Sequence, residues 1–192
     1  MRPAADLTAS EAPGSLRALD DRVDELFSAL RGNPVADRVF YTASALGDFG
    51  LLWLALGLIR VLRDRPGDTR SGLRAIVATG VESVLVNAGV KSLFRRRRPV
   101  PVEAHPLPFR QPLTSSFPSG HATAAFCAAT LLADGERHRA PYYCLALVVA
   151  LSRMHTKIHH ASDVAGGIVI GLLLGHLGKA VAPLKPRARS SR

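Results

Sequence analysis

Long apolar stretches alternate with clusters of arginine, proline and polar residues along most of this chain. A bilayer core about 30 Å thick needs about 20 helical residues for each crossing. Five apolar stretches approach this length and predict membrane spans at residues 40–62, 72–94, 120–133, 141–152 and 164–182. Because bare backbone polar groups are not tolerated in hydrocarbon, these stretches must be helices, and we expect an all-α, multi-pass transmembrane bundle.

The segment before the first span has a different pattern. Between Ser15 and Leu30, apolar residues recur at helical spacing on one side and charged residues occupy the other. This predicts an amphipathic helix that lies on the membrane or covers the bundle. Residues 1–14 are mixed and rich in Ala and Pro, and we expect a disordered lead-in there, a single domain over 15–186 and a basic tail over 187–192.

The charge of the chain bears on its partners. A formal net charge of +10 could indicate a nucleic-acid partner. The basic residues, however, fall in loops that flank the spans, which is typical of membrane proteins and favours membrane lipids over nucleic acid. Cys127 and Cys144 lie inside apolar stretches, and their spacing matches no zinc pattern, so we interpret them as packing residues.

Three polar clusters lie at the ends of the predicted spans. One follows the second span, one opens the third, and one joins the fourth to the fifth. Because consecutive helices alternate in direction, these ends all lie on the same face of the membrane. We therefore expect the clusters to converge; in chain order they are Lys91 with Arg98 and Pro99, then Pro118, Ser119, Gly120 and His121, then Ser152, Arg153, His159 and Asp163.

The cationic members of these clusters suit phosphoryl transfer. The transition state spreads negative charge over three equatorial oxygens, which positioned cations and N–H donors stabilise. Arg98 and Arg153 offer planar donor forks, and Lys91 offers a point charge. Ser119 is a good helix N-cap, and Gly120 lets the backbone at a helix N-terminus approach an anion closely.

Two histidines can supply a nucleophile and a general acid. Asp163 follows His159 by four residues, which would bring the carboxylate beside the imidazole if the segment is helical. There it would fix the tautomer of the ring and stabilise its charged form. His160 leaves two adjacent imidazoles as candidates for the nucleophile, and the spacing to Asp163 favours His159.

The three clusters resemble the signature of the type 2 phosphatidic acid phosphatase (PAP2) superfamily, which includes lipid phosphatases, bacterial acid phosphatases and vanadium haloperoxidases. The resemblance covers about 73 residues, from Lys91 to Asp163, with every spacing kept. It implies that His159 attacks phosphorus and forms a phosphohistidine, that Asp163 orients it, and that His121 protonates the leaving oxygen. It further implies a phosphate site without metal or cofactor, formed by Lys91, Arg98, Ser119, Gly120 and Arg153.

The same resemblance indicates the substrates. Within the family these are lipid phosphate monoesters or diphosphates, such as polyprenyl diphosphates, phosphatidate and phosphatidylglycerol phosphate. The stretch HHASDVAGG and the richness in Arg and Ala also resemble actinobacterial members that act on decaprenylphosphoryl-ribose phosphate in cell-wall synthesis. A vanadium-dependent haloperoxidase and a non-catalytic membrane scaffold are the alternatives; the membrane spans count against the first and the intact motifs against the second.

Several features of the sequence allow two interpretations. Arg95, Arg96 and Arg97 fit a collar at the membrane interface better than a headgroup site. Glu82 is expensive inside a span, and either a functional role or a hydrogen-bond partner such as Asn87 would explain it. The spacing of Gly167, Gly171 and Gly175 predicts close helix packing, within the bundle or at a seam between two copies. We expect the protein in the plasma membrane, and the basic connections on the face opposite the three clusters favour an extracytoplasmic site.

Overall fold

The computed structural model describes residues 14–63, 65, 67–99 and 114–184, and its regular elements there are all helices. The expected lead-in and basic tail lie almost wholly outside these residues. The elements follow one another as α1 (Gly14–Ser28), α2 (Pro34–Gly47), η1 (Asp48–Gly50), α3 (Leu51–Leu62), α4 (Asp68–Val84), η2 (Leu85–Gly89), η3 (Val90–Leu93), α5 (Gly120–Leu132), α6 (Ala140–His155) and α7 (Ala161–Val181).

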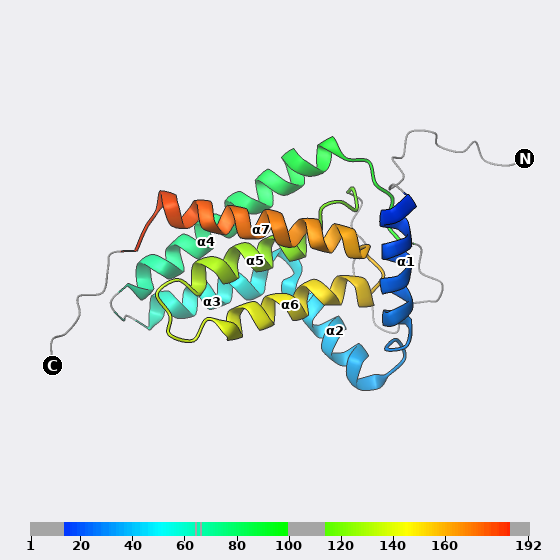
Figure 1. The fold of residues 1–192 in the computed structure, drawn as a ribbon. Helices are drawn as coiled ribbons and strands as arrows, with labels where there is room; N and C mark the ends of the chain where they lie inside the picture. The colour runs from blue at the N-terminus through cyan, green and yellow to red at the C-terminus, as the bar shows by residue number, and fades with distance from the viewer. Residues whose placement is uncertain (1–13, 64, 66, 100–113, 185–192) are drawn as a thin grey trace, which may run out of the picture.

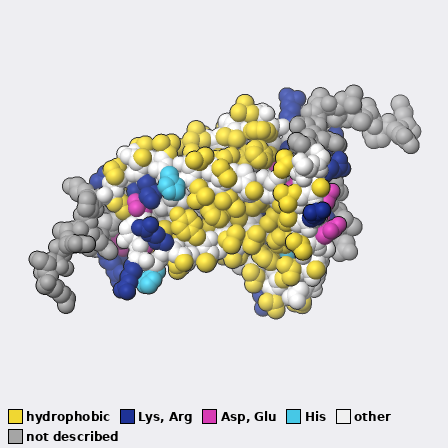
Figure 2. All heavy atoms as spheres, in the orientation of Figure 1, with side chains coloured by type: hydrophobic (Ala, Val, Ile, Leu, Met, Phe, Trp, Pro, Cys, Tyr) yellow, Lys and Arg dark blue, Asp and Glu magenta, His cyan; other side chains and the backbone are white. Residues whose placement is uncertain are grey.

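The bundle has the character of a membrane protein. Three helical stretches are long and apolar enough to cross a bilayer: Pro34–Leu62, Asp68–Leu93 and Ala161–Val181. The shorter helices α5 and α6 run beside them in the same bundle (Figure 1). Figure 2 shows apolar side chains over the middle of the molecule and charged side chains gathered toward its two ends. The prediction of an all-α membrane bundle is thus confirmed. Two of the five predicted spans, those that correspond to α5 and α6, are shorter than a full span.

The first span contains a kink. It begins earlier than expected, at Pro34, because the Asn33 side chain caps the helix by accepting hydrogen bonds from the first backbone amides. It is then interrupted at η1, where Phe49 and Gly50 have φ angles of 55° and 70°. These left-handed conformations break the helix and turn its direction. The kink leaves Asp48 at the same end of the bundle as the other polar clusters.

Helix α5 is the centre of the bundle. It is rich in alanine, is almost completely buried, and contacts α4, α6 and α7. Helix α7 packs on it through its glycine face: a Cβ atom would lie 2.6 Å from the Ser119 carbonyl at Gly167, and 2.4 Å from the Thr123 carbonyl at Gly171. The expected close packing is therefore found within the chain. A seam between two copies through Gly167, Gly171 and Gly175 is wrong, because α5 already occupies this face.

Helix α1 lies across the polar end of the bundle, beside the end of α6 and the start of α7 (Figure 1). Of the two positions expected from the sequence, on the membrane or over the bundle, the helix takes the second. Its only buried residue is Asp20, whereas Leu19 and Leu26 are 50% and 71% exposed. The helix therefore turns a carboxylate inward and leaves apolar side chains exposed.

Candidate active site

Four helix ends meet around one cavity at the end of the bundle that α1 covers. The cavity has a volume of about 530 Å³. Its lining includes Lys91 from η3, Gly120 and His121 from the start of α5, Arg153 from the end of α6, and His159 from the loop before α7. The convergence predicted from the alternation of helix directions is thus present, and both imidazoles border the same space.

The ring of His159 is fixed by partners on both nitrogens. Its Nε2 lies 3.1 Å from Arg98 Nη1, and its Nδ1 lies 3.4 Å from Ser116 Oγ. Since a guanidinium only donates, Nε2 must be the acceptor and the proton must lie on Nδ1. The Ser116 hydroxyl donates to Asp163 Oδ2 at 2.6 Å, so its oxygen is left to accept from Nδ1. This tautomer turns the lone pair of Nε2 toward Arg98 and the cavity.

Burial governs the protonation of His159. The residue is 3% exposed. Burial lowers the pKa of its ring to about 3; the Asp163 carboxylate opposes this effect, and the charges of Arg98 and Arg153 add to it. The ring is therefore neutral at physiological pH.

Asp163 reaches His159 less directly than its spacing predicted. The distance from Asp163 Oδ2 to His159 Nδ1 is 3.8 Å, whereas His160 approaches the same oxygen with its backbone N–H at 2.9 Å and with Nδ1 at 3.1 Å. The reason is that α7 begins only at Ala161, with His160 as its N-cap, so His159 lies outside the helix. Ser116 bridges the carboxylate and the nucleophile candidate.

Arg96 is joined to the same carboxylate. Its Nη1 donates to Asp163 Oδ1 at 2.6 Å and to Ser162 Oγ at 2.7 Å, and its Nη2 donates to Asp20 Oδ2 at 2.6 Å. Asp20 also accepts from the backbone N–H of Ser162, at 2.8 Å. The interpretation of the arginine run as a collar is therefore wrong for Arg96. Sequence reasoning also missed Asp20, which lies on α1, 76 residues before Arg96.

His121 has a carboxylate partner of its own. Its Nε2 lies 3.0 Å from Asp48 Oδ1 and 3.2 Å from the Ser44 carbonyl oxygen. Two oxygen acceptors at Nε2 indicate that this nitrogen carries a proton. The ring also lies against Gly47, where a Cβ atom would come within 2.8 Å of its Cδ2. The break between α2 and α3 thus holds this histidine at the cavity wall.

The cations approach the cavity from three segments. Lys91 lies in the 3-10 turn η3, directly after the π-helical turn η2, and these two turns change the register at the end of α4. Its Nζ would lie 3.5 Å from a Cβ atom at Gly120, so the glycine keeps the space beside the amine open. Arg98 donates to the Thr114 and Ile158 carbonyls as well as facing His159. Arg153 is 1% exposed and donates to the Ser44 hydroxyl.

Other polar residues near this end have structural contacts. Ser119 is the N-cap of α5, and its fully buried hydroxyl accepts from Ala122 N. His155 Nε2 lies 2.7 Å from Asp37 Oδ1. Among the described residues, no group of three or more His, Cys, Asp or Glu side chains could hold a metal ion.

Comparison with known proteins agrees with this geometry. Residues 71–186 match the model of the PAP2 superfamily. The chain is 34% identical over 157 residues to the decaprenylphosphoryl-5-phosphoribose phosphatase of Mycobacterium tuberculosis, covering 77% of this chain and 83% of that protein. Among solved structures, LpxE of Aquifex aeolicus is 30% identical with a TM-score of 0.68, covering 84% of this chain and 95% of that one.

A second solved structure supports the fold. The PAP2-type phosphatidylglycerolphosphate phosphatase of Bacillus subtilis superposes with a TM-score of 0.69 at 24% identity, covering 92% of this chain and 90% of that one. The motifs, the bundle and these relatives lead to one assignment: the chain belongs to the PAP2 superfamily and is a membrane phosphatase of the PAP2 type.

Proposed function

We propose that this protein hydrolyses a lipid-linked phosphate monoester through a phosphohistidine formed on His159. One observation carries the proposal: two imidazoles, His121 and His159, border a single cavity together with Lys91, Arg153 and the open backbone of Gly120. A nucleophile and an acid that flank the same anion can act on opposite sides of one phosphorus atom.

The first step is attack by Nε2 of His159. The neutral ring has its lone pair there, and a bound phosphate would compete with that nitrogen for the Arg98 donor 3.1 Å away. The new N–P bond forms as the bond from phosphorus to the leaving oxygen breaks. The ring becomes an imidazolium, whose charge the Asp163 carboxylate at 3.8 Å stabilises. Lys91 and Arg153 stabilise the equatorial oxygens.

His121 serves the departing and entering oxygens. As an imidazolium, stabilised by Asp48 at 3.0 Å and by the bound phosphate, it donates a proton to the leaving oxygen. The neutral ring then takes a proton from water, whose oxygen attacks phosphorus and breaks the N–P bond. Inorganic phosphate leaves, and both histidines return to their starting forms.

The relatives support a substrate class. The proteins of this family with clear similarity to the chain act, by their names, on decaprenylphosphoryl-5-phosphoribose, on lipid A and on phosphatidylglycerophosphate. We propose a polyprenyl-linked phosphoribose or a similar lipid phosphate for this chain, since the decaprenylphosphoryl-5-phosphoribose phosphatases match most of its length.

The setting is proposed to be the plasma membrane, with the cavity on the extracytoplasmic face. Arg70, Arg74 and Lys179 lie at the end of the bundle opposite the cavity, and positive charge favours the cytoplasmic side. Substrate and phosphate would then be exchanged at the outer leaflet.

The test is phosphate release by the purified full-length protein from a panel of lipid phosphates in mixed micelles. We expect hydrolysis that persists in EDTA, is inhibited by vanadate, and is lost in His159→Ala. The matched control is His176→Ala, an exposed histidine on α7 whose Nδ1 lies 2.8 Å from the Leu172 carbonyl oxygen. Full activity in His159→Ala would contradict the proposed nucleophile.

A further inference from the structure

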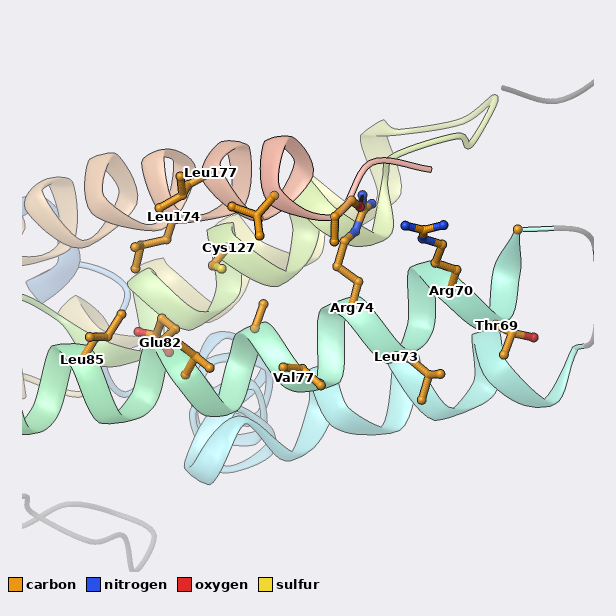
Figure 3. Close-up of a pocket in the computed structure, with 16 residues that line it drawn as sticks. Thr69, Arg70, Leu73, Arg74, Val77, Glu82, Leu85, Cys127, Leu174 and Leu177 are labelled. Atoms are coloured by element: carbon orange, nitrogen blue, oxygen red, sulfur yellow. Dashed lines mark hydrogen bonds between the residues drawn. The ribbon is translucent and has the colours of Figure 1, made fainter. Parts of the chain in front are cut away.

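The catalytic steps leave one buried carboxyl group without a role. Glu82 on α4 is 2% exposed, and its Oε1 has no hydrogen-bond partner among the described residues. Figure 3 shows its side chain directed toward α5, where Cys127 lies. Asn87, the partner considered from the sequence, instead donates to the Ser83 carbonyl at 2.9 Å. An acceptor oxygen that is buried without a hydrogen bond costs free energy, and a donor group of a bound ligand would offset this cost.

Glu82 belongs to a polar strip on the cavity wall. Thr79, Glu82 and Ser83 on α4 and Asn87 on η2 follow one another at helical spacing, and all four line the same cavity as the two histidines. The strip leads from Lys91 toward the middle of the bundle, since Glu82 precedes Lys91 by nine residues, across η2 and part of η3. A phosphate held by Lys91 would fill only one end of this space, so the strip faces whatever is attached to the phosphate.

The opposite side of Glu82 borders a separate groove of about 770 Å³ between α4 and α7, whose lining near Glu82 is mostly apolar: Leu85, Leu174 and Leu177 (Figure 3). Its polar side chains are the Cys127 thiol and, two turns or more along α4, Thr69, Arg70 and Arg74. The hydroxyl and amide groups nearest to Glu82 along the chain, those of Thr79, Ser83 and Asn87, line the cavity instead.

We infer that this strip binds a hydroxyl-bearing unit, a sugar or polyol, that links the phosphate to the hydrocarbon of the substrate. The inference rests on the proposed function. The unpartnered Oε1 of Glu82 can accept a hydrogen bond from a hydroxyl group of such a unit, and the exposed side chains of Ser83 and Asn87 add further polar contacts. Glu82 is thereby a specificity-determining residue: it favours hydroxylated headgroups over a phosphate attached directly to an isoprenoid chain.

The experiment compares two substrates with the same tail, a polyprenylphosphoryl-phosphoribose and the corresponding polyprenyl monophosphate. Glu82→Leu removes both acceptor oxygens, and we expect it to lower kcat/KM for the phosphoribose lipid by roughly 10- to 100-fold while changing that for the monophosphate by less than about 3-fold. Glu82→Gln keeps one acceptor oxygen and should restore part of the preference. The control is Val84→Leu, an exposed position two residues away that is not among the residues lining either cavity.

The outcomes separate this inference from the proposed function. Equal losses on both substrates in Glu82→Leu, or an unchanged preference in an active Glu82→Leu enzyme, would overturn the hydroxyl site and leave the lipid phosphatase intact. A wild-type protein that releases phosphate from neither lipid would remove the proposed function, and this inference with it. A selective loss that Glu82→Gln partly reverses supports the assignment.

Discussion

Replacing Arg96 with alanine should slow turnover, because the guanidinium holds the carboxylate that stands behind the nucleophile. Asp163 is fully buried, and its Oδ2 is occupied by Ser116 and His160. Its Oδ1 accepts from Arg96 at 2.6 Å. Without Arg96 the carboxylate keeps only the contacts of its Oδ2, and its position and field at His159 are less well fixed at the moment when the ring becomes charged.

The size of the effect follows from the type of bond. A hydrogen bond between charged groups contributes about 1.5–3 kcal/mol, and each 1.4 kcal/mol is tenfold in rate, so kcat should fall roughly 10- to 150-fold. KM should change little, since Arg96 does not line the cavity. Arg96→Lys keeps the charge but not the fork that joins Asp20 to Asp163, and we expect an intermediate loss.

The assay is steady-state phosphate release, with kcat and KM determined separately in the same micelles. Arg95→Ala is the matched control, because Arg95 lies in the same run of arginines but its side chain is exposed. It should stay within about twofold of wild type, as for most exposed positions. The reasoning fails if Arg96→Ala keeps the wild-type kcat, if only KM rises, or if Arg95→Ala is equally impaired.

Three further predictions concern other parts of the fold. Asp48→Asn removes the negative charge beside His121 and should lower kcat more than it alters KM; a change in KM alone, in steady-state kinetics, would argue against that role. Gly171→Val should lower the unfolding temperature in detergent, because its Cβ would lie 2.4 Å from the backbone of α5, whereas Gly80→Ala meets nothing within 4 Å and should not. The pKa of His159 is lowered to about 3 in the folded protein, below its unfolded value of about 6.5. Between these two values the unfolded chain binds a proton that the folded chain does not, so this residue lowers the stability of the fold as pH falls from about 6.5 to about 3. NMR of histidine-labelled protein should find the ring neutral at about pH 5, and a charged ring would contradict this.

The placement of the motif residues could be predicted from the sequence because it depends on helix direction alone. Once the apolar stretches are assigned as consecutive spans, the ends that carry Lys91, His121, Arg153 and His159 must lie on one face. The helical glycine spacing likewise predicted the close contact of α7, although only the structure shows that α5 is its partner.

The supporting residues could not be predicted, because loop conformation and distant contacts select them. Arg96 stands among identical neighbours, and only the path of the chain after η3 turns its side chain toward Asp163. In the sequence nothing distinguishes Asp20 and Asp48 from other acidic residues. Their contacts depend on the packing of α1 against α7 and on the kink in the first span. The start of α7 at Ala161 decides the distance between Asp163 and His159, and a helix start is uncertain by one or two residues in any pattern.

The chemical identity of the intermediate tests the account most directly. The full-length enzyme, mixed with a lipid substrate labelled with ³²P in its terminal phosphate and quenched with alkali within one turnover, should carry label that is stable to base and released by acid. Peptide mapping should place it on His159, and His159→Ala should carry no label. Label on His160, or turnover by wild type with no phosphorylated histidine at any quench time, would contradict the central claim.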